Sequence, residues 1–178
     1  SMVGVDDRAA AYQAVSYLIQ QGHRKIAVLG GPATSHPSMM RRQGAQQAME
    51  DAGIRFEDKL YGLSNYDFES AYHAMNGLLA RRAEFTALFA MSDVIAFGAI
   101  RALVSAGLRV PEDVSVIGFD GITMSRYCVP VMTTIVQPSE QIALQSIELL
   151  VRQIEHGTPA QTVTLQPELQ QGESVRAL

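Results

Sequence analysis

The chain has 178 residues, of which 47% are hydrophobic and 18% are charged, and its formal net charge at pH 7 is −4. This composition indicates a folded globular protein, and no apolar run approaches the roughly 20 residues that a membrane span requires. Because the balance is acidic and no basic face is visible, the composition argues against direct DNA binding by this polypeptide.

The cysteine and histidine content limits the chemistry that the chain can perform. Cys128 is the only cysteine, so an internal disulfide is excluded and a reducing compartment, the cytoplasm, is expected. The four histidines show neither HxH nor HExxH spacing, so we expect no metal site. Gly30-Gly31-Pro32 forms neither a GxGxxG nor a Walker loop, so we expect no cofactor either.

Helical and strand patterns alternate along the first two thirds of the chain. Apolar residues recur at helical spacing over about 11–22, 45–53, 71–79 and 93–107, and three of these segments end at a glycine. Continuous apolar runs of strand length lie at 25–30, 60–63, 85–91 and 114–119. This alternation predicts an α/β fold with a doubly wound parallel sheet that helices cover on both faces.

The pattern changes after Asp120. Residues 121–130 predict an irregular loop or a short helix, and the β-rich stretch 131–137 ends at Pro138. Ser139 is a candidate cap for a last helix that Gly157 ends. The apolar face of that helix consists of Ala143, Ile147, Leu150, Val151 and Ile154. A terminal edge strand is expected at 162–165.

Ligands of open parallel sheets bind outside the carboxyl ends of the strands. In this sequence that rule selects four segments, Gly31–Arg41, Ser64–Phe68, Ser92–Asp93 and Asp120–Gly121. They carry a guanidinium, an aromatic ring, three hydroxyls and two carboxylates: Arg41, Tyr66, Thr34, Ser35, Ser92, Asp93 and Asp120. An aromatic platform with charged rims suits a polyhydroxylated small molecule, because the ring stacks on C–H groups and the charged groups bind hydroxyls.

Structural alternatives remain open for these side chains. Asp93 stands where a helix starts, and a capping carboxylate is the commoner role for that position. Tyr66 is equally compatible with a surface loop, and Asp120 with a turn cap. Arg41 in a first helical turn is disfavoured by the helix dipole, which favours a functional role for it.

The sequence does not favour an enzyme. Ser92 lies in Met-Ser-Asp rather than in a GxSxG elbow, and no histidine occupies a comparable strand-end segment. A phosphate-accepting receiver domain needs clustered carboxylates after its first strand, where this chain has Gly-Gly-Pro.

Five segments resemble the LacI/GalR family of transcriptional regulators, in the family's order. They are GHRKIA at 22–27, RxxG at 41–44, SDxxAxGA at 92–99, GLRVPEDVSVIGFD at 107–120 and PVMTTIVQP at 130–138. The resemblance covers almost the whole chain. It implies one half of a periplasmic-binding-protein-like fold, Rossmann-like in its layers.

The resemblance also implies roles for single residues. Arg41 matches the family's effector-binding arginine, Tyr66 a position where an aromatic ring stacks on the effector, and Asp120 an aspartate that contacts effector hydroxyls or ring nitrogens. Ser92 stands where many members have an effector-contacting asparagine, and this departure bears on the identity of the ligand.

Three further positions follow from the same resemblance. Gln137 lies at the crossover between subdomains, near the cleft, and Ser35 belongs to the loop that lines the pocket. His23 lies at the opposite pole, which implies a structural role.

By the same resemblance, a DNA-binding domain and most of an N-terminal subdomain are expected upstream. Residues 1–130 then form the C-terminal subdomain, residues 131–160 a returning segment of the N-terminal half, and residues 161–178 a final strand and tail. We expect the chain alone to bind effector poorly, and the apolar face of its last helix to repack or to pair with another copy.

These expectations together describe an allosteric regulator. A small polar effector, such as a sugar, shifts a two-state equilibrium whose other ligand is operator DNA, contacted only through the upstream domain of a homodimer. A sugar-binding protein of a transport system is the alternative from another class, and an α/β enzyme is a more distant one.

Overall fold

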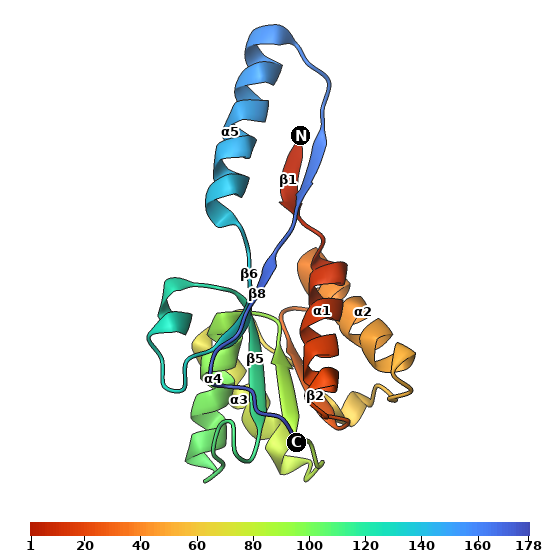
Figure 1. The fold of residues 1–178 in the computed structure, drawn as a ribbon, viewed down its shortest axis with the longest axis vertical. Helices are drawn as coiled ribbons and strands as arrows, with labels where there is room; N and C mark the ends of the chain where they lie inside the picture. Colours follow the sequence, from red (N-terminus) through yellow and green to blue (C-terminus); the bar gives the residue numbers. More distant parts are fainter.

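The computed structural model describes all residues from Ser1 to Leu178 and consists of two parts (Figure 1). We call residues 6–137 and 167–178 the body, and residues 1–5 and 138–166 the arm. The body contains a six-stranded sheet in the order β3-β2-β4-β5-β6-β8. The arm contains one long helix beside a separate two-stranded sheet, β1-β7, and projects from one end of the body.

The body sheet is parallel except at one edge. Its strands are β2 (Ile26–Gly30), β3 (Tyr61–Leu63), β4 (Ala87–Ala90), β5 (Ser115–Asp120), β6 (Thr133–Val136) and β8 (Glu168–Gln170). β8 is the antiparallel strand and pairs with β6. The sequence patterns predicted the five parallel strands and missed β8, whose residues Glu-Leu-Gln form no apolar run.

Two pairs of helices cover the sheet on opposite sides (Figure 1). One pair is α1 (Asp7–Gln20) with α2 (His36–Asp51), and the other is α3 (Phe68–Ala80) with α4 (Asp93–Ser105). The expected doubly wound α/β architecture is therefore confirmed. Short 3-10 turns, η1 (Asp58–Leu60) and η2 (Thr123–Arg126), precede β3 and follow β5.

Two glycines allow the paired helices to touch. A Cβ on Gly44 of α2 would lie 2.0 Å from the carbonyl oxygen of Arg8 in α1. A Cβ on Gly98 of α4 would lie 2.5 Å from the carbonyl oxygen of Phe68 in α3. Any side chain at these positions would push a helix pair apart, which explains the glycines of the RxxG and SDxxAxGA segments.

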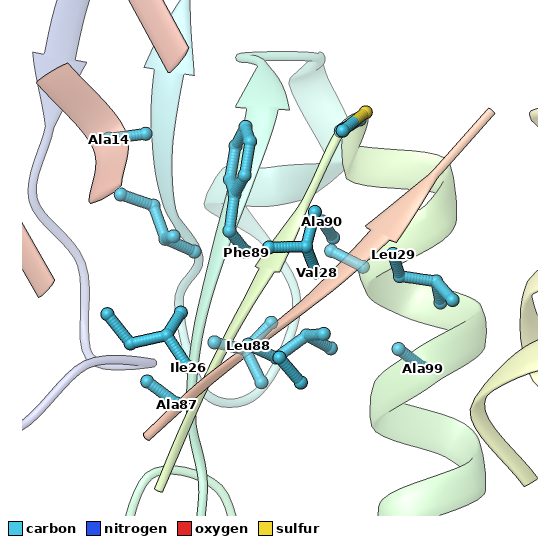
Figure 2. Close-up of a cluster of buried hydrophobic side chains, with 14 of the residues drawn as sticks. Ala14, Ile26, Val28, Leu29, Ala87, Leu88, Phe89, Ala90 and Ala99 are labelled. Atoms are coloured by element: carbon cyan, nitrogen blue, oxygen red, sulfur yellow. The ribbon is translucent and has the colours of Figure 1, made fainter. Parts of the chain in front are cut away.

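The hydrophobic core lies between the sheet and these helices and contains 32 buried residues. Every residue of β2 and β4 is buried. Figure 2 shows side chains of these strands, such as Phe89, between Ala14 of α1 and Ala99 of α4. Because alanines line the helices, large side chains from the strands fill the space between layers.

The C-terminal tail is also part of the body. Ser174 is fully buried: its hydroxyl donates to the carbonyl oxygen of Val116 at 2.6 Å and accepts from the amide of Thr133 at 2.8 Å. His23 is fully buried too, and its ring nitrogens contact the Thr86 hydroxyl and the Arg176 carbonyl oxygen. His23 precedes β2, so its contacts are structural ones at the amino ends of the strands, as expected.

The arm is built from β1 (Met2–Val5), α5 (Ser139–His156) and β7 (Thr162–Leu165). β1 pairs in parallel with β7, so the strand expected at 162–165 exists but lies outside the main sheet. Gly157 ends α5 in a left-handed conformation (φ 61°), as predicted. Ser139 is the first helical residue and makes no capping bond, so the expected cap is wrong.

The apolar face of α5 is exposed. Within this helix only Leu149 is buried, whereas Leu144, Ile147, Leu150, Val151 and Ile154 are between 42% and 74% exposed. The face has not repacked onto the body, contrary to one of the two outcomes expected for it. No helix of the chain has both the length and the apolar character to cross a membrane.

Candidate functional site

Polar side chains converge at the carboxyl ends of β4, β5 and β6, where the body meets the arm. Arg41 reaches this edge from α2, Asp7 from the start of α1, Asp120 from the end of β5 and Gln137 from the residue after β6. Of the residues predicted from the sequence, Arg41, Asp120 and Gln137 are therefore brought together.

Arg41 is the centre of this cluster and is only 6% exposed. Its Nε donates to Asp7 Oδ1 at 2.7 Å, and its Nη1 donates to the carbonyl oxygen of Met91 at the end of β4. The guanidinium carbon lies 3.6 Å from the ring centroid of Phe119, and Nη1 lies 3.6 Å from Asp120 Oδ1. Arg41 thus spans the ends of two strands, a geometry that suits the planar guanidinium fork.

Asp120 faces Arg41 from a left-handed backbone conformation with φ 111°. Its Oδ1 accepts a hydrogen bond from Gln137 Nε2 at 2.7 Å. Burial raises the pKa of the Asp120 carboxyl, and the nearby Arg41 guanidinium opposes that rise. Two carboxylates, Asp7 and Asp120, therefore flank one guanidinium, and this net negative group favours a neutral, hydroxyl-bearing ligand over an anionic one.

Asp93 lies behind Asp120 and is fully buried. Its Oδ1 accepts from the Thr134 hydroxyl at 2.6 Å and its Oδ2 from the Ile122 amide at 2.8 Å. Burial raises its pKa to about 6, against which the hydrogen bonds from Thr134 and Ile122 act. The sequence suggested a cap for its own helix, and the structure shows instead a carboxylate that binds two other segments.

Tyr66 lies apart from the Arg41–Asp120 pair. Its ring packs on the segment after β2, since a Cβ on Gly31 would lie 2.2 Å from it. The Tyr66 hydroxyl is buried without a hydrogen-bond partner, and its backbone is left-handed (φ 60°). Because β4 lies between β2 and β5, the strand at whose end the Tyr66 ring packs is two strand spacings, about 10 Å, from the strand that carries Asp120. The three predicted residues share one edge, with Tyr66 at its far end.

Ser92 and Ser35 are engaged as helix caps. The Ser92 hydroxyl accepts from the Ile95 amide at 3.1 Å at the start of α4, and Ser92 is 4% exposed. The Ser35 hydroxyl accepts from the Ser38 amide at 3.5 Å at the start of α2. Each hydroxyl oxygen therefore already accepts one hydrogen bond from its own helix. The contacts with an effector that were expected for Ser92 and Ser35 stay predictions.

Two members of the cluster were missed by the sequence reasoning. Asp7 begins α1, directly after the chain passes from the arm into the body, and Phe119 stands out in the sequence only as part of an apolar strand run. The sequence alone does not show that Asp7 contacts Arg41. The two residues are 34 positions apart, and their contact depends on the packing of α1 against α2. Asp7 and Gln137 both lie beside a connection between the arm and the body, and this shared position was the available sign that Asp7 belongs to the cluster.

Comparison with known proteins places these features in context. Residues 15–175 match the family described as "Periplasmic binding protein-like domain". The chain is 38% identical over 174 residues to the HTH-type transcriptional regulator MalR of Clostridium butyricum, covering 98% of this chain and 52% of MalR. It is 39% identical over 153 residues to the HTH-type transcriptional repressor CytR of Escherichia coli K12, covering 86% of this chain and 45% of CytR.

Solved structures give the same result. The transcriptional regulator CelR in complex with cellobiose superposes with a TM-score of 0.94 at 35% identity, over 98% of this chain and 54% of CelR. A sugar-binding LacI-family regulator from Escherichia coli, complexed with phosphate, superposes with a TM-score of 0.88 at 33% identity, over 98% of this chain and 63% of that one. The chain spans about half the length of the curated relatives it matches. These relatives are regulators, and the comparisons give no support to a transport protein or an enzyme.

Proposed function

Because the chain belongs to the periplasmic binding protein-like family in the form carried by LacI-family transcriptional regulators, we propose that it is the effector-sensing part of such a regulator. Its effector is a sugar or a related polar metabolite, and effector binding controls the affinity of the whole protein for operator DNA. The observation that carries the proposal is the buried Arg41, held by Asp7 and facing Asp120 at the edge of the sheet.

The chemistry of this edge suits hydroxyl groups. An arginine donates hydrogen bonds and an aspartate accepts them, so the Arg41–Asp120 pair binds a group that does both. The Tyr66 ring at the other end of the edge offers a surface for the C–H face of a sugar. CelR, which has the same fold, was solved with cellobiose bound. Neither a metal nor a cofactor takes part in this proposal, and no catalytic role is assigned to these residues.

The position of the cluster suits allosteric control. Asp7 and Gln137 contact Arg41 and Asp120, and each lies next to a segment that crosses between body and arm. A ligand that binds the Arg41–Asp120 pair therefore acts directly on the connections between the two parts. Effector and operator affinities are then reciprocally linked through one equilibrium. A protein that binds operator DNA works where the chromosome is, so we assign it to the cytoplasm.

The chain contributes one wall of the effector cleft under this proposal. The body then corresponds to a C-terminal subdomain, and residues 1–5 and 138–166 correspond to segments of the N-terminal half. The boundaries expected at residues 130 and 160 move to 137 and 166, because β6 and β8 pair within the body sheet. We therefore expect weak effector binding by the 178-residue chain and tight binding by the full-length product of its gene.

Calorimetry on that full-length protein tests the proposal, with cellobiose, maltose, ribose and adenosine as probes. Asp120→Asn keeps the shape of the side chain and removes its charge, so we expect at least a tenfold weaker affinity for the probe that binds. Lys25→Met, a change in the exposed ion pair with Glu84 on another surface, is the matched control and leaves affinity unchanged. Equal affinity in wild type and Asp120→Asn would contradict the assigned site.

We propose further that the protein is a homodimer that uses an apolar surface beside α3 and α4. A groove of about 470 Å³ opens there, lined by Phe68, Phe97, Ile100, Arg101, Val104, Met124, Cys128, Val129 and Pro130. Val129 is 94% exposed. Glu69 and Arg101 line an adjoining groove, so two copies related by a twofold axis can pair these opposite charges. Exposed apolar surface of this kind marks a contact site.

Sedimentation velocity on the 178-residue chain tests the dimer. Val129→Asp introduces a charge into the apolar surface at its most exposed residue, and we expect it to shift the protein from dimer to monomer. Leu178→Asp places the same charge at an exposed apolar residue elsewhere and serves as the control. A wild-type chain that sediments as a monomer at all concentrations would refute this assignment of the surface.

A further inference from the structure

The effector-facing position of Asp120 depends on an unusual turn. Asp120 (φ 111°) and Gly121 (φ 69°) both adopt positive φ in succession. Gly121 cannot be exchanged for another residue, because its Cβ would lie 2.6 Å from Val136 Cγ2. A residue with a side chain, such as Asp120, keeps a positive φ only where its surroundings hold it there.

Asp93 holds this turn from behind. Its Oδ2 accepts from the Ile122 amide, the first amide after Gly121, and its Oδ1 accepts from the Thr134 hydroxyl in β6. The carboxylate also lies against β5, since a Cβ on Gly118 would be 2.2 Å from Asp93 Oδ1. Asp93 thus contacts the strand before the turn, the residue after it and the neighbouring strand.

The usual role of an acidic residue at a helix start does not account for these contacts. A capping carboxylate accepts from amides of its own first turn. In α4 that role is filled by the Ser92 hydroxyl, which accepts from the Ile95 amide. Both Asp93 oxygens accept their hydrogen bonds from groups outside α4. The helix dipole favours a carboxylate at this position, but it does not explain why the side chain is buried against β5 and β6.

We propose that Asp93 is a positioning residue that fixes the 120–121 turn and so aims the Asp120 carboxylate at Arg41 and Gln137. This inference rests on the proposed function only in one respect, namely that Asp120 binds the effector. Its structural part concerns the turn itself and is independent of any ligand.

Two substitutions separate positioning from general stability. In Asp93→Asn, the side-chain oxygen accepts from Ile122 and the amide group donates to Thr134 Oγ1, so both hydrogen bonds persist without the charge. In Asp93→Ala both are lost. Leu78→Ala, in the core between the sheet and α3, is the control because it lowers stability without touching the turn.

The first measurement is made on the 178-residue chain by NMR. It records the exchange rate of the Ile122 amide and the side-chain NH2 signal of Gln137, which reports the hydrogen bond to Asp120. We expect Asp93→Ala to speed Ile122 exchange by at least about tenfold over Leu78→Ala and to move the Gln137 signal toward that of a free amide. Asp93→Asn restores both toward wild type. An Asp93→Ala spectrum with both signals unchanged would overturn the proposal.

The second measurement is the affinity of the full-length protein for the probe that binds in calorimetry. Asp93→Ala is expected to weaken it about tenfold and Asp93→Asn by less than about threefold. If no probe binds, or if Asp120→Asn binds the probe as tightly as wild type does, the proposed function fails. The NMR result still decides the role of Asp93 in that case. If Asp120→Asn weakens binding and Asp93→Ala does not, the positioning role fails alone.

Discussion

The body and the arm differ in how far each buries its apolar side chains. The body buries a core of 32 residues between two helix pairs and a sheet, and its strands β2 and β4 are wholly enclosed. The arm has as good a helical pattern, yet α5 buries only Leu149 and shows its apolar face to solvent. A periodic sequence thus specifies which face of a helix is apolar, whereas the partner for that face must come from elsewhere.

Most of the stability of this chain resides in the body. The small sheet of the arm pairs only the arm's own strands, β1 and β7, and the chain connections join the arm to the body, so the arm adds little burial to the fold. All 32 residues of the core cluster lie in the body. In the full-length relatives, which are about twice as long, the extra chain is the natural candidate to cover the arm.

The largest expected effect compares one large side chain from each part. Phe89→Ala in β4 leaves a cavity in the core and should lower the free energy of unfolding by about 3–5 kcal/mol. Leu150→Ala on α5, whose side chain is 56% exposed, should lower it by less than about 0.5 kcal/mol. Urea titration followed by circular dichroism measures both. Equal losses of unfolding free energy would mean that the arm and the body unfold as one unit, contrary to the difference in burial described above.

A smaller effect concerns pH and belongs to the body alone. Burial raises the pKa of Asp93 from 3.8 to about 6, so its ionisation opposes folding. The stability contribution of this group is complete below the unfolded-state pKa of 3.8 and is lost as the pH rises through about 6. Asp93→Asn does not ionise, so its stability relative to wild type should increase between pH 4 and pH 7 by on the order of 3 kcal/mol.

The comparison with Asp93→Asn is needed because His23 acts in the opposite direction. Burial lowers the pKa of His23, so its contribution is present above about 6.5 and is lost as the pH falls. Both proteins contain His23, and its effect cancels in their difference. Urea titrations of the two proteins at pH 4, 5, 6 and 7 provide the measurement. A difference that stays constant over this range would show that Asp93 is not perturbed by burial.

The sequence predicted the layered body well because its signals are local. Buried strands appear as continuous apolar runs, and Gly22, Gly53 and Gly107 mark where helices end. Each of these three glycines has a positive φ, which is why a glycine stands there. The strand-end rule then located Arg41 and Asp120 on one edge without any knowledge of their contacts.

The parts that escaped prediction depend on contacts between distant positions. Asp7 reaches Arg41 across 34 positions, and Asp93 reaches Ile122 across 29. The use of Ser92 as a cap, in contrast, follows from the helix predicted at 93–107, because a serine directly before a helix is a favoured N-cap. Packing decides the contacts of Asp7 and Asp93, and a single sequence shows the residue types without the geometry.

The tail that closes the body has a consequence for the order of biosynthesis. Ser174 links β5 to β6, and the Leu178 amide donates to the Gln21 carbonyl oxygen at the end of α1. On the ribosome, every strand and helix of the body except β8 emerges before α5 and β7 of the arm, and these last residues emerge after them. The nascent body therefore cannot complete its fold until α5 and β7 have been translated. Until then the amino ends of β5 and β6 lack their contacts with Ser174.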